Sequence, residues 1–468
     1  MRIGFPFGGH LNLRAGLAAS LLLGTAAAPL TLPPPSGDPQ RIDFTADPLL
    51  RFAHTAVPAE PFLARLGEAA AHHPAVVAAI AEAQAVQGVR AQVRSGLFPQ
   101  LDASLTGSRQ LARDFGSRDT IVESLQPRGR VDAALTGEQL LFDWGATGNR
   151  IAAANERILA ARAEVDRVAT NTALAAVAAW YDVLAAETLV TLGSDAQARQ
   201  RDILGQVRER VAQGLGAGGD VARGEAMLAD ARAVSARYGR LLGQARARYR
   251  ESFGDDPPAM LARPLAPPSQ AQSLDAAAAL ARRGPAVIAA LKRAEATRRD
   301  WRAVRADGLP RLTAGIAATR YAVFERPDYE IRGLFTLRQS LSAGGRQRGI
   351  VAEASAKSRA ADADADRAAG ESERDAEAAF ADVAALGRSV AALAASYTAT
   401  RQVRDAYVEQ FRVSRGSLIE LLRAEQDYQA TAAALLQAVC DLDVARFALL
   451  ARTGEMLPAA GIRLDMTL

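Results

Sequence analysis

The residue pattern closest to a known chemical motif is the glycine-rich run GLGAGG at residues 214–219, which has the G-x-G-x-x-G spacing of dinucleotide-binding loops. In such loops the glycines follow a strand and open a helix inside a βαβ unit. Here a helical pattern precedes the run, and no βαβ pattern surrounds it. The run is therefore predicted to be a turn between two helices, and a nucleotide-binding enzyme is disfavoured.

Residues that could bind metal or catalyse a reaction are sparse. His72 and His73 are adjacent, but the other two histidines, His10 and His54, lie far away in the N-terminal region. Cys440 is the only cysteine, so no internal disulfide can form. No nucleophile, base and acid can be assembled from the sequence. We therefore expect no enzyme activity, no cofactor and no metal site.

The composition favours long helices over a thick globular core. Of the 468 residues, 49% are apolar but only 5% are aromatic, and alanine, arginine, leucine and valine dominate. Such a composition suits helices that pack through narrow seams, as in coiled coils. The basic run RRDWRAVR at residues 298–305 is interpreted as a solvated helix face, and nucleic-acid binding is not expected.

The first 28 residues have the pattern of a secretory signal peptide. Arg2 and Arg14 precede a short apolar run, which ends in small residues at Ala26 to Ala28. A buried N-terminal helix is the alternative. Residues 29–61 are rich in proline and are predicted to be an extended tether. No later segment is predicted as a transmembrane helix, so a membrane would have to be crossed by strands.

Two long passages of the sequence match each other. Residues 94–108 and 305–319 correspond at an offset of 211 residues, and each follows a helix pattern that starts at a proline and stops at Gly-Leu before another proline. Apolar residues then alternate with period two, which predicts β-hairpins at residues 100–139 and 311–340. Each strand is about ten residues long, which suffices to cross a hydrocarbon layer when tilted.

After the hairpins the match continues without a gap at an offset of 200 residues, with QLLFDWG at 139–145 over QSLSAGG at 339–345. A repeat near this length indicates a duplicated domain rather than a solenoid. We predict a first repeat at 62–256, a linker at 257–284, a second repeat at 285–456 and a tail at 457–468. The predicted long helices are 146–213 and 347–413, and the predicted returning helices are 220–253 and 418–452.

Four strands cannot form a stable sheet in lipid by themselves. An open sheet exposes unpaired amides at both edges, and each costs several kcal/mol in hydrocarbon. The strands could exist there only in a closed barrel shared by several copies of the chain. Two copies would give an eight-stranded barrel filled by side chains, whereas three would give twelve strands and a lumen, so a trimer is favoured.

In several of these features together, the chain resembles TolC-type outer-membrane efflux proteins. They are the paired strand starts, QLLFDWG and QSLSAGG, and the helix turns RVAQGLGAGGDV at 210–221 and FRVSRGSLIELL at 411–422. The resemblance implies a mainly α protein with transmembrane β-strands, in which a homotrimer shares a twelve-stranded barrel in outer-membrane lipid. Long helices would form a periplasmic α-barrel that works with a periplasmic adaptor and an inner-membrane transporter.

The resemblance also implies two acidic rings at the periplasmic aperture, at Asp220 and Glu420. Their alternatives are ordinary roles at helix starts, as an N-cap and as a first-turn carboxylate. The chain departs from the family in two ways. Arg423 stands where another acid is usual, and Gly219, Phe411 and Gly416 stand where polar latch partners are usual. We hypothesise that Arg415 faces Asp220 and holds a closed state.

The same turns match the adaptor-docking tips of the family. The residues concerned are Gln213, Gly214, Leu215, Gly216, Ser414, Arg415, Gly416 and Ser417. The sequence LFDWG leans slightly toward type I protein secretion, and drug or metal efflux is the alternative. A periplasmic coiled-coil scaffold without a barrel is the alternative from another class, and the polarity of the strand faces would discriminate between them.

Overall fold

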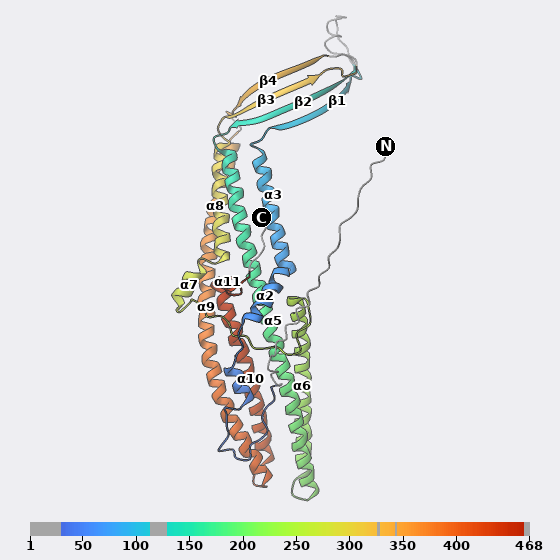
Figure 1. The fold of residues 1–468 in the computed structure, drawn as a ribbon, viewed down its shortest axis with the longest axis vertical. Helices are drawn as coiled ribbons and strands as arrows, with labels where there is room; N and C mark the ends of the chain where they lie inside the picture. The colour runs from blue at the N-terminus through green and yellow to red at the C-terminus, as the bar shows by residue number, and fades with distance from the viewer. Residues whose placement is uncertain (1–29, 113–128, 325–327, 342–343, 463–468) are drawn as a thin grey trace, which may run out of the picture.

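Long helices run along the molecule, and a four-stranded sheet crosses one end (Figure 1). This computed structural model describes residues 30–112, 129–324, 328–341 and 344–462. The predicted signal peptide at 1–28 and part of the first hairpin loop therefore lie outside the described residues.

The helical part consists of two similar sets of helices. In the first set, α3 (Pro74–Ser95) leads to the sheet, α5 (Ala146–Ala212) descends from it and α6 (Gly218–Phe253) returns. In the second set, α8 (Pro285–Ala306), α9 (Arg346–Arg412) and α10 (Leu418–Arg452) take the same roles. The sequences of α5 and α9 contain no proline, so each continues for 67 residues, or about 100 Å at 1.5 Å per residue.

The sheet contains β1 (Gln100–Arg109), β2 (Gly129–Phe142), β3 (Arg311–Arg320) and β4 (Tyr329–Arg338). The strands are antiparallel in the order β1-β2-β3-β4, so the two repeats contribute neighbouring hairpins. Within the described part of one chain, β1 and β4 are edge strands without a further partner.

The register aligns apolar residues on one face of the whole sheet. Leu105 lies opposite Ala133, Leu135 opposite Ala318, and Ala318 opposite Ile331. The other face carries polar pairs such as Thr106 with Asp132, Thr319 with Glu330, and Thr313 with Thr336. Many of the apolar side chains are exposed in the single chain, among them Leu101, Leu105, Ile331, Phe335 and Leu337.

A β-bulge adds an aromatic residue to the apolar face. The register shifts between Leu140 and Phe142, so that Leu140 lies opposite Thr313 but Phe142 lies opposite Leu312. Without the shift, Phe142 would fall on the polar face, because successive side chains of a strand point to opposite sides.

The LFDWG motif forms the junction between β2 and α5. The Asp143 carboxylate accepts hydrogen bonds from the backbone N–H of Gly145 at 3.1 Å and of Thr147 at 2.7 Å, and so caps the start of α5. Trp144 and Gly145 have positive φ angles of 56° and 81°, and the Trp144 indole N–H donates to Pro310 O. In the second repeat, Gly344 and Gly345 also have positive φ angles.

The largest core lies midway along the helices, where short helices pack around the long ones. It includes Trp180, Tyr181, Tyr249, Tyr428 and Phe447, all buried. The short helices are α1 (Pro48–His54), α2 (Glu60–His72), α7 (Leu274–Ala281) and α11 (Met456–Ala459). A second, smaller core lies at the end of the helices remote from the sheet.

The structure corrects the prediction of an extended tether at 29–61. Residues 30–61 pack against the long helices and include α1, whose Leu49 and Leu50 are buried. The helix is only 7 residues long, too short for an apolar period to stand out from its proline-rich surroundings.

By length and composition alone, α5 and α9 each contain a stretch that could cross a membrane. The α5 stretch is 61% buried within the chain, so core packing accounts for its apolar character. Only 6% of the residues in the α9 stretch are buried, so most of this apolar stretch is at least partly exposed in the single chain.

Candidate functional site at the helical tips

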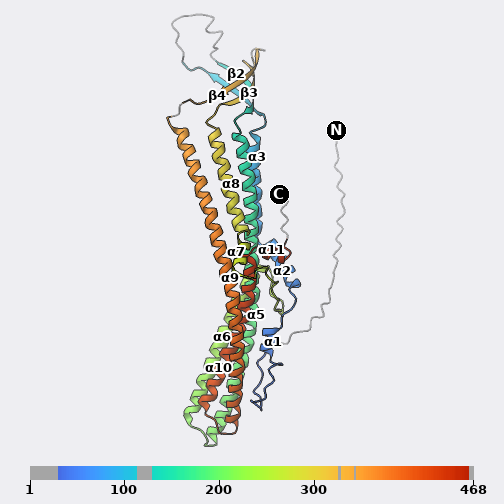
Figure 2. The ribbon, with the colours of Figure 1, turned by 90° about the vertical axis from the view of Figure 1, so that its left-hand side faces the viewer.

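The two helix-to-helix turns lie side by side at the end opposite the sheet (Figures 1 and 2). They have the same backbone geometry. Gly214 and Ser414 have φ angles of 74° and 60°, and their N–H groups donate to Val211 O at 3.0 Å and Phe411 O at 3.1 Å. This left-handed C-terminal turn satisfies carbonyls that the ending helix leaves free. The duplicated sequence therefore builds the same tip twice.

Gly216 and Gly416 allow each turn to fold closely back on its helix. A Cβ atom at Gly416 would lie 2.9 Å from Phe411 N and 3.1 Å from the backbone carbon of Gln410. At Gly216 the nearest atom would be Val211 Cγ2, at 3.0 Å. The GLGAGG run thus forms a turn after helix α5, which is not the strand-loop-helix context of a dinucleotide site.

A small apolar core joins the two tips. Its buried members are Ile203, Val207, Phe411, Leu418, Leu421 and Leu422. Phe411, which the family resemblance placed near the aperture, is 4% exposed and lies in this core. Within one chain its side chain therefore packs the tip and does not face an open passage.

Arg210 connects the tips through polar contacts. Its Nη2 donates to Phe411 O at 2.6 Å and to Ser414 Oγ at 2.7 Å, and its guanidinium lies over the Phe411 ring at 4.1 Å. This arrangement combines charged hydrogen bonds with a cation–π contact. Arg210 was not among the residues predicted from the sequence, because its equivalent in the second repeat is Gln410 and its partners lie about 200 residues away.

Asp220 lies in the first turn of α6. Its carboxylate accepts a hydrogen bond from the backbone N–H of Ala217 at 3.3 Å, and its own N–H donates to Ala217 O. Asp220 therefore supports the start of α6 as the third residue of the helix. The N-cap position, suggested for Asp220 from the sequence, is occupied by Ala217. In the described part of a single chain no ion pair joins it to Arg415, whose side chain is exposed. The proposed pair could form only between neighbouring chains or after a rearrangement.

Glu420 and Arg423 lie on the exposed face of the first turns of α10, while Leu418, Leu421 and Leu422 are buried. Ser417 caps this helix by accepting from the N–H of Ile419 at 3.2 Å. The carboxylate of Glu420 is therefore free to face solvent or a neighbouring chain.

The other predicted tip residues form an exposed surface. The exposed residues are Gln213, Gly214, Leu215, Gly216, Ser414, Arg415 and Ser417, and Gly416 is half-buried. Leu215 is 73% exposed and Val413 is 56% exposed. Two large apolar side chains at the tips thus face outward in the single chain.

The adjacent histidines have local structural roles. The His72 ring lies 2.9 Å from Glu68 O, and His73 accepts a hydrogen bond from Ala75 N–H at the start of α3. Both contacts are within or next to their own helices.

Comparisons with known proteins agree with this architecture. Residues 66–255 match the family model described as "Outer membrane efflux protein". The chain is 27% identical over 383 residues to the outer membrane efflux protein BepC of Brucella suis biovar 1 (strain 1330), a match that covers 79% of this chain and 81% of that protein.

Solved structures show the same fold. The structure of CusC, studied for folding and transmembrane channel formation, matches with a TM-score of 0.75 at 13% identity, over 90% of this chain and 98% of CusC. The outer membrane protein VceC of Vibrio cholerae matches with a TM-score of 0.74 at 17% identity, over 84% of this chain and 96% of VceC.

Proposed function

Because this chain belongs to the outer membrane efflux protein (TolC) family, whose members are channels and not enzymes, we propose that three copies form one export duct. The chain is an outer-membrane channel with a periplasmic extension. In the proposed assembly, an inner-membrane pump supplies the energy and a periplasmic adaptor joins the pump to the tips.

The polarity of the two faces of the sheet is the main support for this proposal. The register of the sheet gives a mainly apolar face and a mainly polar face across all four strands, with Leu140 and Leu334 as apolar exceptions on the polar face. A barrel between lipid and water requires such a division. A scaffold whose hairpins pack against helices would instead bury the apolar face. Here residues of that face are exposed, including Leu105 at 67% and Phe335 at 80%.

Neighbouring copies would complete the surfaces that one chain leaves open. The edges β1 and β4 can pair with β4 and β1 of the adjacent copies, which removes both open edges. The partly exposed apolar stretch of α9 would likewise pack against a helix of a neighbour. Three copies give twelve strands, enough for a water-filled lumen.

We infer that the exposed tips receive the adaptor. Leu215 and Val413 offer apolar contacts, and Gln213, Ser414 and Arg415 offer hydrogen-bond donors around them. Glu420 would form an acidic ring at the aperture under threefold symmetry, which favours cations.

Small molecules or metal ions are the favoured cargo of the duct. The name of the relative BepC describes efflux, and LFDWG, the motif that favoured type I secretion, has a structural explanation independent of cargo. Its Asp143 caps α5 and its Trp144 contacts Pro310 O. Any family member with the same strand-to-helix junction could use such a motif.

Deleting the gene tests both parts of the proposal. We expect the deletion strain to become at least several-fold more susceptible to dyes, detergents, hydrophobic antibiotics or metal ions, and the wild-type gene to restore resistance. Loss of a secreted protein with unchanged susceptibility would instead favour type I secretion. Membrane fractionation must place the protein in the outer membrane as a trimer, and a soluble monomer would contradict the duct.

A further inference from the structure

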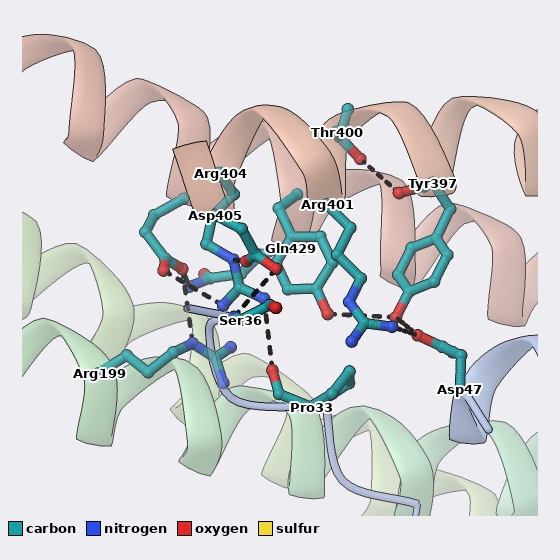
Figure 3. Close-up of polar contacts among 12 residues, drawn as sticks. Pro33, Ser36, Asp47, Arg199, Tyr397, Thr400, Arg401, Arg404, Asp405 and Gln429 are labelled. Atoms are coloured by element: carbon teal, nitrogen blue, oxygen red, sulfur yellow. Dashed lines mark hydrogen bonds and ion pairs between the residues drawn. The ribbon is translucent and has the colours of Figure 1, made fainter. Parts of the chain in front are cut away.

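A buried polar cluster attaches the N-terminal segment to the long helices (Figure 3). We call residues 30–57 the N-terminal clasp. The clasp contacts both α5 and α9, and Figure 3 shows its Pro33, Ser36 and Asp47 directed at polar side chains of α9.

Asp47 holds the start of the clasp helix to α9. One carboxylate oxygen accepts from the N–H groups of Leu49 and Leu50, which caps α1. The other accepts from Arg401 Nη1 at 2.5 Å and from Tyr397 OH at 3.0 Å. Asp47 is 1% exposed and Arg401 is 7% exposed, so this ion pair is shielded from water.

Arg263 holds the other end of α1. Its Nη1 donates to Phe52 O at 2.7 Å and Ala53 O at 3.1 Å, which are carbonyls at the C-terminal end of the helix. Its Nε and Nη2 donate to the two oxygens of Asp443 on α10. A carboxylate at the N-terminus and a guanidinium at the C-terminus both complement the helix dipole.

The lower part of the clasp reaches further toward the tips. Ser36 N–H donates to Asp405 Oδ2 at 3.2 Å, and Arg404 Nη2 donates to Pro33 O at 3.3 Å. Leu32 N–H donates to Asp195 on α5 at 3.3 Å. The clasp thus contacts α5 and α9 at the same level of the molecule.

Beside the clasp, a set of charged side chains connects α9, α10 and α5. Arg404 pairs with Asp405 at 2.6 Å, and Glu425 on α10 lies 3.6 Å from Arg404 and 3.4 Å from Arg199 on α5. Arg404, Asp405 and Glu425 are at most 1% exposed. Removing one member of such a set leaves a buried charge without compensation, which is strongly destabilising.

We propose that the clasp is a positioning element for the aperture, because it holds α9 and α10 against α5 and so opposes separation of the two tips. Arg401 precedes Phe411 by ten residues on one continuous helix, which is about 15 Å. A displacement of α9 at the clasp would therefore be transmitted to the contacts of Arg210 with Phe411 and Ser414. The inference rests on the proposed channel function.

The test compares Asp47→Asn and Asp47→Ala with Asp43→Ala in the full-length trimer. Asp47→Asn keeps an acceptor for the α1 cap but removes the charge that pairs with Arg401. Asp43 is an exposed carboxylate of the same segment and serves as the matched control. Among the residues that the structure describes, it accepts hydrogen bonds from Thr45 alone. Hydrogen–deuterium exchange of residues 48–57 reports clasp release, and conductance in planar bilayers reports the aperture.

We expect both Asp47 variants to exchange faster at residues 48–57 and to conduct at least twofold more than wild type, with Asp43→Ala unchanged. Combining Asp47→Ala with Arg401→Ala should give less than the sum of the single effects, because no buried charge is then left alone. Wild-type conductance with a released clasp, or no release in either variant, would overturn the inference. Failure of the wild-type protein to form any pore would instead overturn the proposed function.

Discussion

Arg210 joins the two helical tips by contacts that a lysine could not reproduce, because its planar guanidinium both donates to Phe411 O and Ser414 Oγ and stacks on the Phe411 ring. It lies on the last turn of α5, whereas its partners are Phe411 on the last turn of α9 and Ser414 just after that helix. The tips are therefore coupled within one chain by a side chain, in addition to their apolar core.

Arg210→Ala is expected to loosen the C-terminal tip. The loss of two charged, partly exposed hydrogen bonds should cost about 1 kcal/mol locally. Hydrogen–deuterium exchange of residues 411–417 should then increase about fivefold. Arg208→Ala is the matched control, because Arg208 pairs with Glu225 across an exposed surface where such pairs contribute little. Equal exchange in the two variants would show that the apolar core alone holds the tip.

Asp220→Asn separates the two roles considered for Asp220. Asparagine can still accept the hydrogen bond from Ala217 N–H, so trimer stability should change by less than about 0.5 kcal/mol. If Asp220 also forms an acidic ring, removing three charges should lower the cation-to-anion permeability ratio in bilayers. Glu420→Gln should lower the ratio as well, because Glu420 has an exposed side chain. Unchanged selectivity in both variants would contradict acidic rings at the aperture.

At the residue scale, the sequence predicted which positions would occupy the tips but not the contacts that hold them. The glycine spacing and the resemblance located the two turns and their acids. Arg210 has no such signal, since arginines occur throughout the helices and its partners belong to the other repeat. Phe411 was expected at the aperture, and only the three-dimensional packing reveals it as a core residue.

At the scale of one element, we expect the tip turns to tolerate alanine less well at Gly416 than at Gly216. Gly416→Ala would place Cβ against the backbone of Phe411 and Gln410, which cannot move without reshaping the turn. We expect a loss of about 1 to 3 kcal/mol in trimer unfolding free energy. Gly216→Ala should cost less, because the nearest atom is the end of the Val211 side chain. Denaturation of the two variants side by side measures the difference, and equal losses would contradict this explanation.

The contribution of the Asp143 carboxylate to stability at the start of α5 is expected to depend on pH. Burial alone would raise the pKa of Asp143, but hydrogen bonds from Thr147 and Gly145 and the charge of Arg150 hold that pKa below its usual 3.8. The ionised carboxylate therefore stabilises the fold above about pH 4, and this contribution is lost as the pH falls through the lowered pKa. Asp143→Ala should cost about 0.5 to 2 kcal/mol at pH 7, and the gap from wild type should narrow near pH 2.

Unfolding of wild type and Asp143→Ala at both pH values checks this prediction. Asp143→Asn keeps an acceptor for the Thr147 N–H and should lie between them at pH 7. A gap that does not depend on pH would mean that the carboxylate charge contributes nothing to the start of the helix.

At the scale of elements, periodicity was informative wherever a segment was long or regular. The period of two in the hairpins and the proline-free stretches of α5 and α9 correspond to observed strands and helices. The bulge at Leu140 and Phe142 could not be predicted, because the apolar residues around it fit a regular strand equally well without a register shift. The N-terminal clasp was missed because buried charge pairs with distant partners leave no periodic pattern.

The whole molecule has an open sheet with one apolar face, and this combination distinguishes a lipid-embedded barrel from a scaffold. Leu105 lies near the middle of β1 on the apolar face, and Thr106 lies next to it on the polar face opposite Asp132. In a barrel the first residue faces hydrocarbon and the second faces the lumen. In a scaffold that packs its hairpins against other helices, the same apolar face would be covered by protein.

Leu105→Arg should therefore disrupt the trimer in the membrane, whereas Thr106→Arg should be tolerated. An arginine facing lipid near the bilayer midplane costs about 2 to 4 kcal/mol, and three symmetric copies multiply the penalty. The lumen-facing arginine stays in water beside Asp132 and should mainly alter ion selectivity. Outer-membrane fractions analysed for trimers in mild detergent would show Leu105→Arg depleted and Thr106→Arg at wild-type level. Equal tolerance of both variants would mean that neither face contacts lipid, and the strands would then have to be closed by protein contacts outside the membrane.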